Sequence, residues 1–162
     1  MSTITSTVAV NASLDTAWEA ISNVGHVENW HPDVKRSPVL TPEPTGIGAQ
    51  RRCDMFDGTS VVETITALKD REMVQVELSE FPMPFDRASI VLRLQELGPK
   101  QVEIKLECDF DVNDGLDAEM LKPTMNQTFA HILDGLDQHL VTGERIDDPS
   151  PESRNAPDIA AL

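Results

Sequence analysis

Arg52 and Glu63 are the residues of this 162-residue sequence best suited by type and spacing to act together. The dipeptide Asp57-Gly58 between them is typical of a two-residue hairpin loop, which would place Arg52 directly opposite Glu63. A guanidinium can stabilise a developing enolate or carboxylate, and a carboxylate can move a proton. His31 is a third candidate for acid–base chemistry, because histidine titrates near neutral pH.

The strand predicted at residues 73–79 indicates which way these charges point. A tight loop before it places Glu63 opposite Leu78, on the face that carries the apolar side chains of both strands. Arg52 and Asp54 are then expected to point inward with Glu63. Buried charges must pair or meet water, and Arg52 opposite Glu63 supplies a pair. Three readings stay open: a structural ion pair, a ligand-binding pair, or a twist or bulge that turns the charges to solvent.

Periodic patterns predict the elements around this hairpin. Ser13 is a good cap for a helix to about Asn23, and Val27 with Trp30 indicates one more helical turn. Pro38 limits the strand that contains it to an edge or an irregular stretch. Alternation of apolar and polar residues predicts strands at residues 3–10, 35–41, 51–56, 59–67, 73–79, 88–97 and 102–112.

A long helix is predicted from residue 116 to about Thr142, ended by Gly143, with a break or kink at Pro123. His131 falls opposite its apolar face and is expected to be solvated. We predict one domain over residues 1–143 and a disordered, acidic, proline-containing tail over residues 144–162. The apolar face of the helix carries Leu121, Met125, Phe129, Ile132, Leu133, Leu136 and Leu140.

Composition excludes several classes of function. A net charge of -15 leaves no basic stripe for nucleic acid and disfavours an anionic membrane surface. Cys53 and Cys108 fall within strand patterns and are expected to be buried, reduced thiols. We find no signal peptide, membrane-spanning run, metal-ligand spacing, nucleophile motif or phosphate loop. We therefore expect a cytoplasmic monomer or homodimer with no metal and no cofactor.

The order of these elements resembles the helix-grip fold of the START-like, or SRPBCC, superfamily, and its polyketide cyclase/dehydrase branch in particular. The resemblance rests on short motifs in a fixed order along the chain: Ala17-Trp18, Ile21-Ser22-Asn23, Trp30-His31-Pro32, Gly46-Ile47-Gly48-Ala49, Arg51-Arg52, Asp57-Gly58, Glu63 and the long helix. It implies an α+β domain with a curved antiparallel sheet wrapped around a long C-terminal helix, and two short helices after the first strand. It also implies an internal cavity for lipids, sterols, polyketides or other small apolar molecules.

The implied cavity gives three hypotheses for function. The first is a binding module for a small hydrophobic or aromatic molecule, lipid-like or polyketide-like. The second is a cyclase, aromatase or dehydrase that uses Arg52, Glu63 and His31, and the third is an interaction protein. Trp30 could stack on a ligand or anchor its helix, and Phe81, Met83 and Phe85 could line an entrance or pack as a corner. The residues expected at the cavity are Trp30, Arg52, Asp54, Glu63, Ile65, Val76, Phe81, Met83, Phe85, Met125, Phe129 and Ile132.

Overall fold

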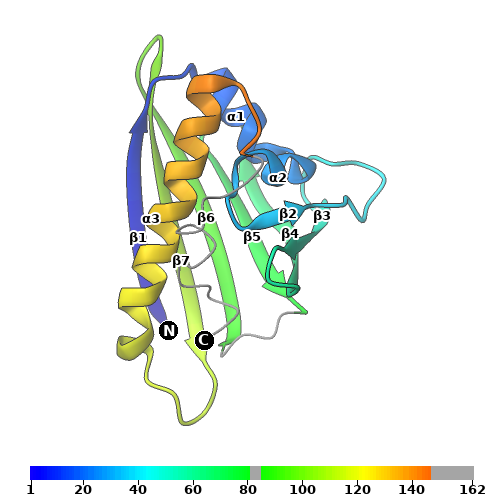
Figure 1. The fold of residues 1–162 in the computed structure, drawn as a ribbon, viewed down its shortest axis with the longest axis vertical. Coiled ribbons are helices and arrows are strands. Elements are labelled where there is room, and N and C mark those ends of the chain that lie inside the picture. The colour runs from blue at the N-terminus through cyan, green and yellow to red at the C-terminus, as the bar shows by residue number, and fades with distance from the viewer. Residues whose placement is uncertain (81–84, 147–162) are drawn as a thin grey trace.

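The computed structural model of the chain describes residues 1–80 and 85–146, and it has the helix-grip fold. Seven antiparallel strands form one curved sheet in the order β1-β7-β6-β5-β4-β3-β2, and the helices lie on one side of it (Figure 1). The elements are β1 Ser2–Val10, α1 Leu14–Ser22, η1 Val24–His26, α2 Val27–Trp30, β2 Val34–Arg36, β3 Gln50–Met55, β4 Ser60–Lys69, β5 Met73–Ser79, β6 Phe85–Gly98, β7 Gln101–Val112 and α3 Ala118–Thr142.

The N-terminal elements follow the predicted pattern closely. Ser13 caps α1, where its side chain accepts a hydrogen bond of 3.2 Å from the backbone N–H of Thr16. The strand that precedes Pro38 is β2, which has three residues and lies at the sheet edge, as predicted. Next to β1 at the other end of the sheet, β7 alternates between more exposed and buried side chains from Gln101 to Asp111 and pairs with both β1 and β6.

The β3–β4 hairpin differs from the prediction by one residue. Its loop contains Phe56, Asp57 and Gly58, because Met55 donates its backbone N–H to Thr59 at 2.9 Å. Gly58 has φ +92°, which fits a three-residue loop that ends in a glycine bulge. One extra loop residue shifts every pair of the hairpin and reverses the faces of β3.

Two irregularities cancel in the next hairpin. Residues 70–72 form a three-residue loop, so Lys69 pairs with Met73, one step away from the expected register. A bulge between Ile65 and Ala67 restores that register, and Glu63 lies opposite Leu78 as predicted. Glu63 is therefore buried on the apolar face.

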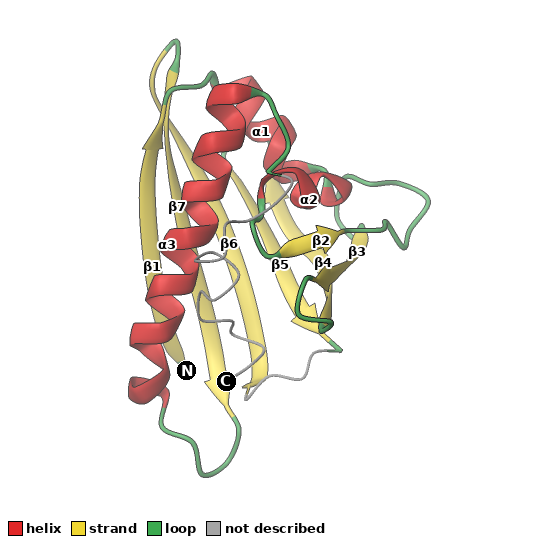
Figure 2. Ribbon diagram, in the orientation of Figure 1, coloured by secondary structure: helices red, strands yellow, loops and turns green. Residues whose placement is uncertain are grey.

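The long helix α3 packs along β1 and β7 and covers the concave side of the sheet (Figure 2). It runs through Pro123 as one element, so of the predicted break or kink the break is wrong. Residues Met125, Phe129 and Leu136 are almost completely buried against the sheet, as its apolar face predicts. Beyond Gly143, the backbone N–H of Ile146 bonds to Asn29 O of α2 at 2.9 Å. The rest of the predicted tail, residues 147–162, lies outside the described residues.

Candidate functional site

A cavity of about 80 Å³ lies between the sheet and the helices. Most of its wall is apolar, and Arg51, Glu63, His31, Asp33, Cys53 and Thr128 add polar groups. This volume is well below the roughly 300–1,000 Å³ of typical pockets for small molecules. Its wall comprises Ile21, Val27, Trp30, His31, Asp33, Arg51, Cys53, Met55, Val61, Glu63, Val74, Val76, Leu78, Ile90, Leu92, Leu106, Thr128, Phe129 and Ile132.

The residues predicted at the cavity, together with the acid–base candidate His31, divide into four groups. The structure places Trp30, His31, Glu63, Val76, Phe129 and Ile132 in the wall. Three others are buried core residues that do not line the cavity: Ile65, Phe85 and Met125. Two fall on the opposite face of β3, namely Arg52 and Asp54, and two lie outside the described residues, namely Phe81 and Met83.

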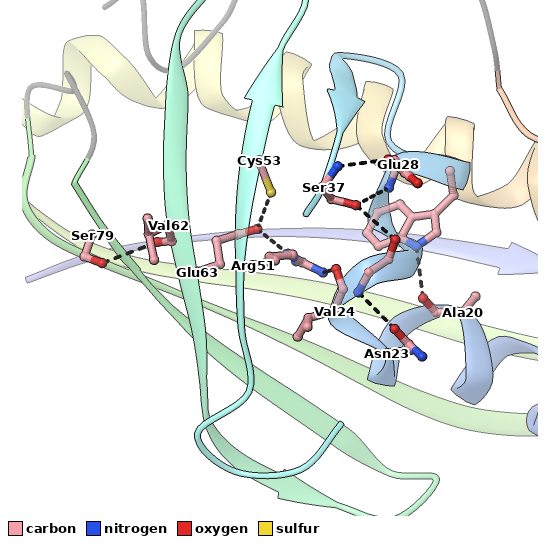
Figure 3. A network of polar contacts seen from close by, with 12 residues as sticks. Ala20, Asn23, Val24, Glu28, Ser37, Arg51, Cys53, Val62, Glu63 and Ser79 are labelled. Carbon is pink, nitrogen blue, oxygen red and sulfur yellow. Dashed lines mark hydrogen bonds and ion pairs between the residues drawn. The ribbon is translucent and has the colours of Figure 1, made fainter. Parts of the chain in front are cut away.

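Arg51, and not Arg52, is the partner of Glu63. The two residues are paired across β3 and β4, and Arg51 Nε donates to Glu63 Oε1 at 2.8 Å. A second donor, the thiol of Cys53, reaches the same oxygen at 3.0 Å, and Arg51 Nη1 donates to Val24 O at 3.2 Å. Figure 3 shows Arg51, Cys53 and Glu63 pointing toward one another from the two strands. Both charged residues are less than 10% exposed.

The electrostatics of this cluster favour an ionised pair. Burial by itself would raise the pKa of Glu63, but the Arg51 guanidinium and the Cys53 thiol outweigh it and hold that pKa below its usual value. Burial, followed by the Glu63 carboxylate, raises the pKa of the Cys53 thiol well above normal. Cys53 is therefore a neutral hydrogen-bond donor and not a reactive thiolate.

One oxygen of Glu63 remains available to a ligand. Oε1 accepts both side-chain hydrogen bonds, and Oε2 has no hydrogen-bond partner within residues 1–80 and 85–146. A carboxylate has about four lone-pair positions, so this pattern leaves acceptor capacity in the cavity wall. Since the rest of that wall is mainly apolar, Glu63 and Asp33 are the two carboxylates that a bound molecule would meet there.

His31 is held as a neutral imidazole. Its Nδ1 accepts a hydrogen bond of 3.1 Å from the backbone N–H of Asp33, so Nδ1 carries no proton and Nε2 carries the hydrogen. Burial lowers the pKa of His31 to about 4, with Arg51 adding to the effect and Glu63 opposing it. At neutral pH the ring is therefore a hydrogen-bond donor through Nε2 and carries no charge.

Trp30 anchors α2. Its indole Nε1 donates to Ala20 O of α1 at 3.0 Å, and the side chain is 4% exposed. The indole ring of Trp30 also stacks on the imidazole ring of His31, and the centroids of the two rings are 6.2 Å apart. Glu28 and Ser37 join α2 to the start of the sheet edge through hydrogen bonds of 2.9 and 3.3 Å (Figure 3). These contacts fix the segment that carries His31. Trp18 of α1 is partly buried and packs against the core.

The prediction that His131 is solvated is wrong. Its Nε2 atom is buried, has no hydrogen-bond partner in the described part of the chain, and lies 3.7 Å from Asp33 Oδ1. Burial raises the pKa of Asp33, while His131 acts in the opposite direction. The helical pattern missed this contact because the segment after α2 folds back against α3.

Arg52 and Asp54 belong to the outer face. Arg52 Nε donates to Asp54 Oδ1 at 2.7 Å, and Arg36 Nε of β2 donates to Asp54 Oδ2 at 2.8 Å. Arg52 is substantially exposed. This cluster joins β2 to β3 at the sheet edge and takes no part in the cavity. The alternation of Arg51, Cys53 and Met55 was the sequence signal for the correct face, because two of the three are apolar.

The two acid–base candidates in the cavity wall, His31 and Glu63, both have pKa values shifted away from neutral pH. An efficient acid or base has a pKa close to the working pH, whereas His31 and Glu63 are both shifted below their ordinary values. No three His, Cys, Asp or Glu side chains in the described ranges are grouped so that they could hold a metal ion. Within the same ranges, no helix has the length and hydropathy that crossing a membrane requires.

A protein-family model described as "Polyketide cyclase / dehydrase and lipid transport" matches residues 1–141. Among similar solved structures, XoxI from Bacillus cereus is 14% identical, with 88% of this chain and 97% of that chain covered and a TM-score of 0.76. A START superfamily protein from Mycobacterium smegmatis is 18% identical, with 86% and 97% covered and a TM-score of 0.72. A protein from Thermobifida fusca is 21% identical, with 86% and 93% covered and a TM-score of 0.73. A search of curated protein sequences gives no match.

Proposed function

The chain belongs to the polyketide cyclase/dehydrase and lipid transport family, and from this premise we propose that it binds a small apolar or aromatic molecule between α3 and the sheet. The observation that carries the proposal is Glu63 Oε2, an oxygen of a buried residue that accepts no hydrogen bond from the described residues, in the wall of a largely apolar cavity. A ligand with one hydroxyl or amide N–H would satisfy this oxygen while its apolar part fills the cavity.

The charges of the wall favour a neutral ligand. Arg51 is already bonded to Glu63 and to Val24 O, so its charge is matched, and a ligand carboxylate would face the unmatched oxygen of Glu63. Neutral His31 offers a donor through Nε2 and adds no positive charge. The site therefore suits an alcohol, phenol or amide better than an organic acid.

The alternative function, a cyclase or dehydrase, was expected to use Arg52 in the cavity, and Arg52 is not there. Arg52, assigned to steady a developing negative charge, lies on the outer face with Asp54. Arg51 takes its place near Glu63, where its Nε donates to Glu63 Oε1 and its Nη1 donates to Val24 O. Binding therefore explains the geometry with fewer assumptions than acid–base catalysis does.

The test compares two probes that differ by a single hydroxyl, phenol and benzene, titrated against the protein and followed by NMR chemical shifts. Phenol should bind about tenfold more tightly than benzene, since a hydrogen bond to a charged group contributes about 1.5 kcal/mol or more. Glu63→Gln should remove most of this preference. The matched control is Glu77→Gln, an identical change at a residue outside the cavity wall, which should keep it.

Two outcomes would count against the proposal. If neither probe binds the wild-type protein at millimolar concentration, the cavity does not accept small aromatic molecules. If both bind with equal affinity, and Glu63→Gln changes neither, the cavity binds apolar groups but Glu63 takes no part in recognition.

A further inference from the structure

Gly135 lies in the middle of α3, where its backbone needs no glycine. Its φ is in the ordinary helical range, and glycine in a helix interior is about 1 kcal/mol less favourable than alanine. The reason for glycine here is space. A Cβ at this position would lie 2.5 Å from Trp30 O and 2.8 Å from the Cδ and Cγ atoms of Pro32. Carbon atoms do not approach backbone oxygen or a proline ring so closely, so any side chain would push the two segments apart.

The segment that Gly135 contacts forms part of the cavity wall. Trp30, His31 and Asp33 all line the cavity, and Pro32 stands between the last two. His131 lies one helical turn before Gly135, on the same face of α3, and contacts Asp33. This face of α3 therefore packs against the segment from Trp30 to Asp33, with close approaches at Trp30, Pro32 and Asp33.

That stretch transmits a displacement directly to His31. The backbone of Asp33 donates to His31 Nδ1 at 3.1 Å, and Asp33 O accepts from Phe56 N of the hairpin loop at 3.1 Å. At the start of the same stretch, the indole Nε1 of Trp30 donates a hydrogen bond to Ala20 O of α1. A shift of Pro32 away from α3 would therefore turn or withdraw the imidazole from the wall.

The volume of the cavity makes this contact important for ligand choice. An apolar cavity that holds benzene in another protein measures about 150 Å³, whereas the cavity here measures about 80 Å³. A ligand of one aromatic ring must therefore enlarge it, and the contact between α3 and Pro32 limits how far the wall can move.

We infer that Gly135 is a specificity-determining and positioning residue: its missing side chain lets α3 close on Trp30 and Pro32, which holds His31 in the wall and restricts the cavity to small ligands. The part of this inference that concerns ligand size rests on the proposed function. The part that concerns His31 does not, because it can be tested without any ligand.

The test uses Gly135→Ala, with Gly98→Ala as the matched control. Gly98 has no positive φ, and a Cβ there would meet nothing within 4 Å. The first measurement is the titration of the His31 ring by NMR. In the wild type it should titrate near pH 4, and in Gly135→Ala its midpoint should rise toward the unperturbed value of about 6.5. The groups that act on His31 are Glu63, Arg51 and His131, and both variants retain all three.

The second measurement is the ratio of dissociation constants for 2-naphthol and phenol. Gly135→Ala should lower this ratio about tenfold, because a displaced wall admits the second ring, whereas Gly98→Ala should leave it unchanged. If Gly135→Ala does not fold, Pro32→Ala serves in its place. It removes the ring atoms on the other side of the contact and should change both measurements in the same direction.

Each outcome decides between the alternatives. A folded Gly135→Ala or Pro32→Ala protein with an unchanged His31 midpoint and an unchanged ratio overturns the inference. A raised midpoint with an unchanged ratio overturns the specificity role and supports the positioning role. If no probe binds any variant, the specificity role fails together with the proposed function, and the His31 titration still decides whether Gly135 positions the imidazole.

Discussion

Arg51 and Glu63 face each other across the β3–β4 hairpin, and Arg51 Nε donates to Glu63 Oε1 at 2.8 Å inside the cavity wall. Each of the two residues is less than 10% exposed to solvent. Neither residue could be buried alone, because an unpaired charge in such a place costs several kcal/mol. The pair therefore stabilises the wall, and it leaves the second oxygen of the Glu63 carboxylate without a hydrogen-bond partner among the described residues.

Arg51→Met should destabilise the protein by about 3–5 kcal/mol at pH 7, since it leaves the Glu63 carboxylate buried without its cation. Arg52→Met is the matched control, an identical change at the next residue on the exposed face, and it should alter stability little. Urea unfolding of both variants measures the difference. Equal losses of stability in the two variants would contradict the assignment of faces.

Stability should depend on pH through His31. The pKa of His31 is about 4 in the folded chain and about 6.5 when unfolded, so the unfolded chain binds the extra proton first. Above about pH 6.5 this residue contributes no pH dependence, and between pH 6.5 and 4 the free energy of unfolding should fall by about 3 kcal/mol. His31→Asn keeps an acceptor for the Asp33 N–H and cannot titrate, so it should flatten this part of the profile.

The pH profile is measured by urea unfolding in steps of half a pH unit. Asp33 acts in the opposite direction, because burial raises its folded pKa and it takes up its proton earlier in the folded chain. Only the difference between the wild type and His31→Asn is therefore attributed to His31. A variant profile that keeps the wild-type slope would show that the imidazole is not desolvated as described.

The two tryptophans should differ in their contribution to stability. Trp30→Phe removes the donor to Ala20 O and should cost about 2 kcal/mol, because a buried carbonyl loses its partner. Trp18 is half-buried, and its indole has no hydrogen bond within the described ranges, so Trp18→Phe should cost less. Thermal unfolding of each variant, followed by circular dichroism, measures both effects. A larger loss for Trp18→Phe would mean that Trp30 does not anchor α2.

Gly58→Ala should destabilise the hairpin by about 1–2 kcal/mol, because Gly58 has φ +92° and a side chain is strained there. Gly98→Ala should leave stability unchanged or slightly higher, since it reduces the freedom of the unfolded chain without strain. Chemical denaturation measures both. A neutral Gly58→Ala would argue against the three-residue loop.

Much of the fold could be predicted because it depends on local patterns. The alternation along residues 102–112 predicted β7, Ser13 predicted the start of α1, and the apolar face of the long helix predicted which side of α3 is buried. The same patterns placed Glu63 on the inner face, because the apolar residues of β4 and β5 share that face with it.

The candidate site was harder to predict, because it depends on single-residue steps and on contacts between distant segments. Arg51 and Arg52 are adjacent and chemically identical, so choosing the partner of Glu63 required the exact length of the hairpin loop. The contact of His131 with Asp33 joins residues 98 positions apart, and the close approach at Gly135 joins α3 to Pro32.

The sequence by itself determined the order of the elements, their buried faces and the inward direction of Glu63, because hydrophobic periodicity acts within each segment. The tertiary structure alone decided that Arg51 is the buried cation, that His31 is held neutral and that α3 closes on Pro32. Each of these depends on how far a loop shifts a strand or how closely two segments approach, and side-chain periodicity carries no information about such distances.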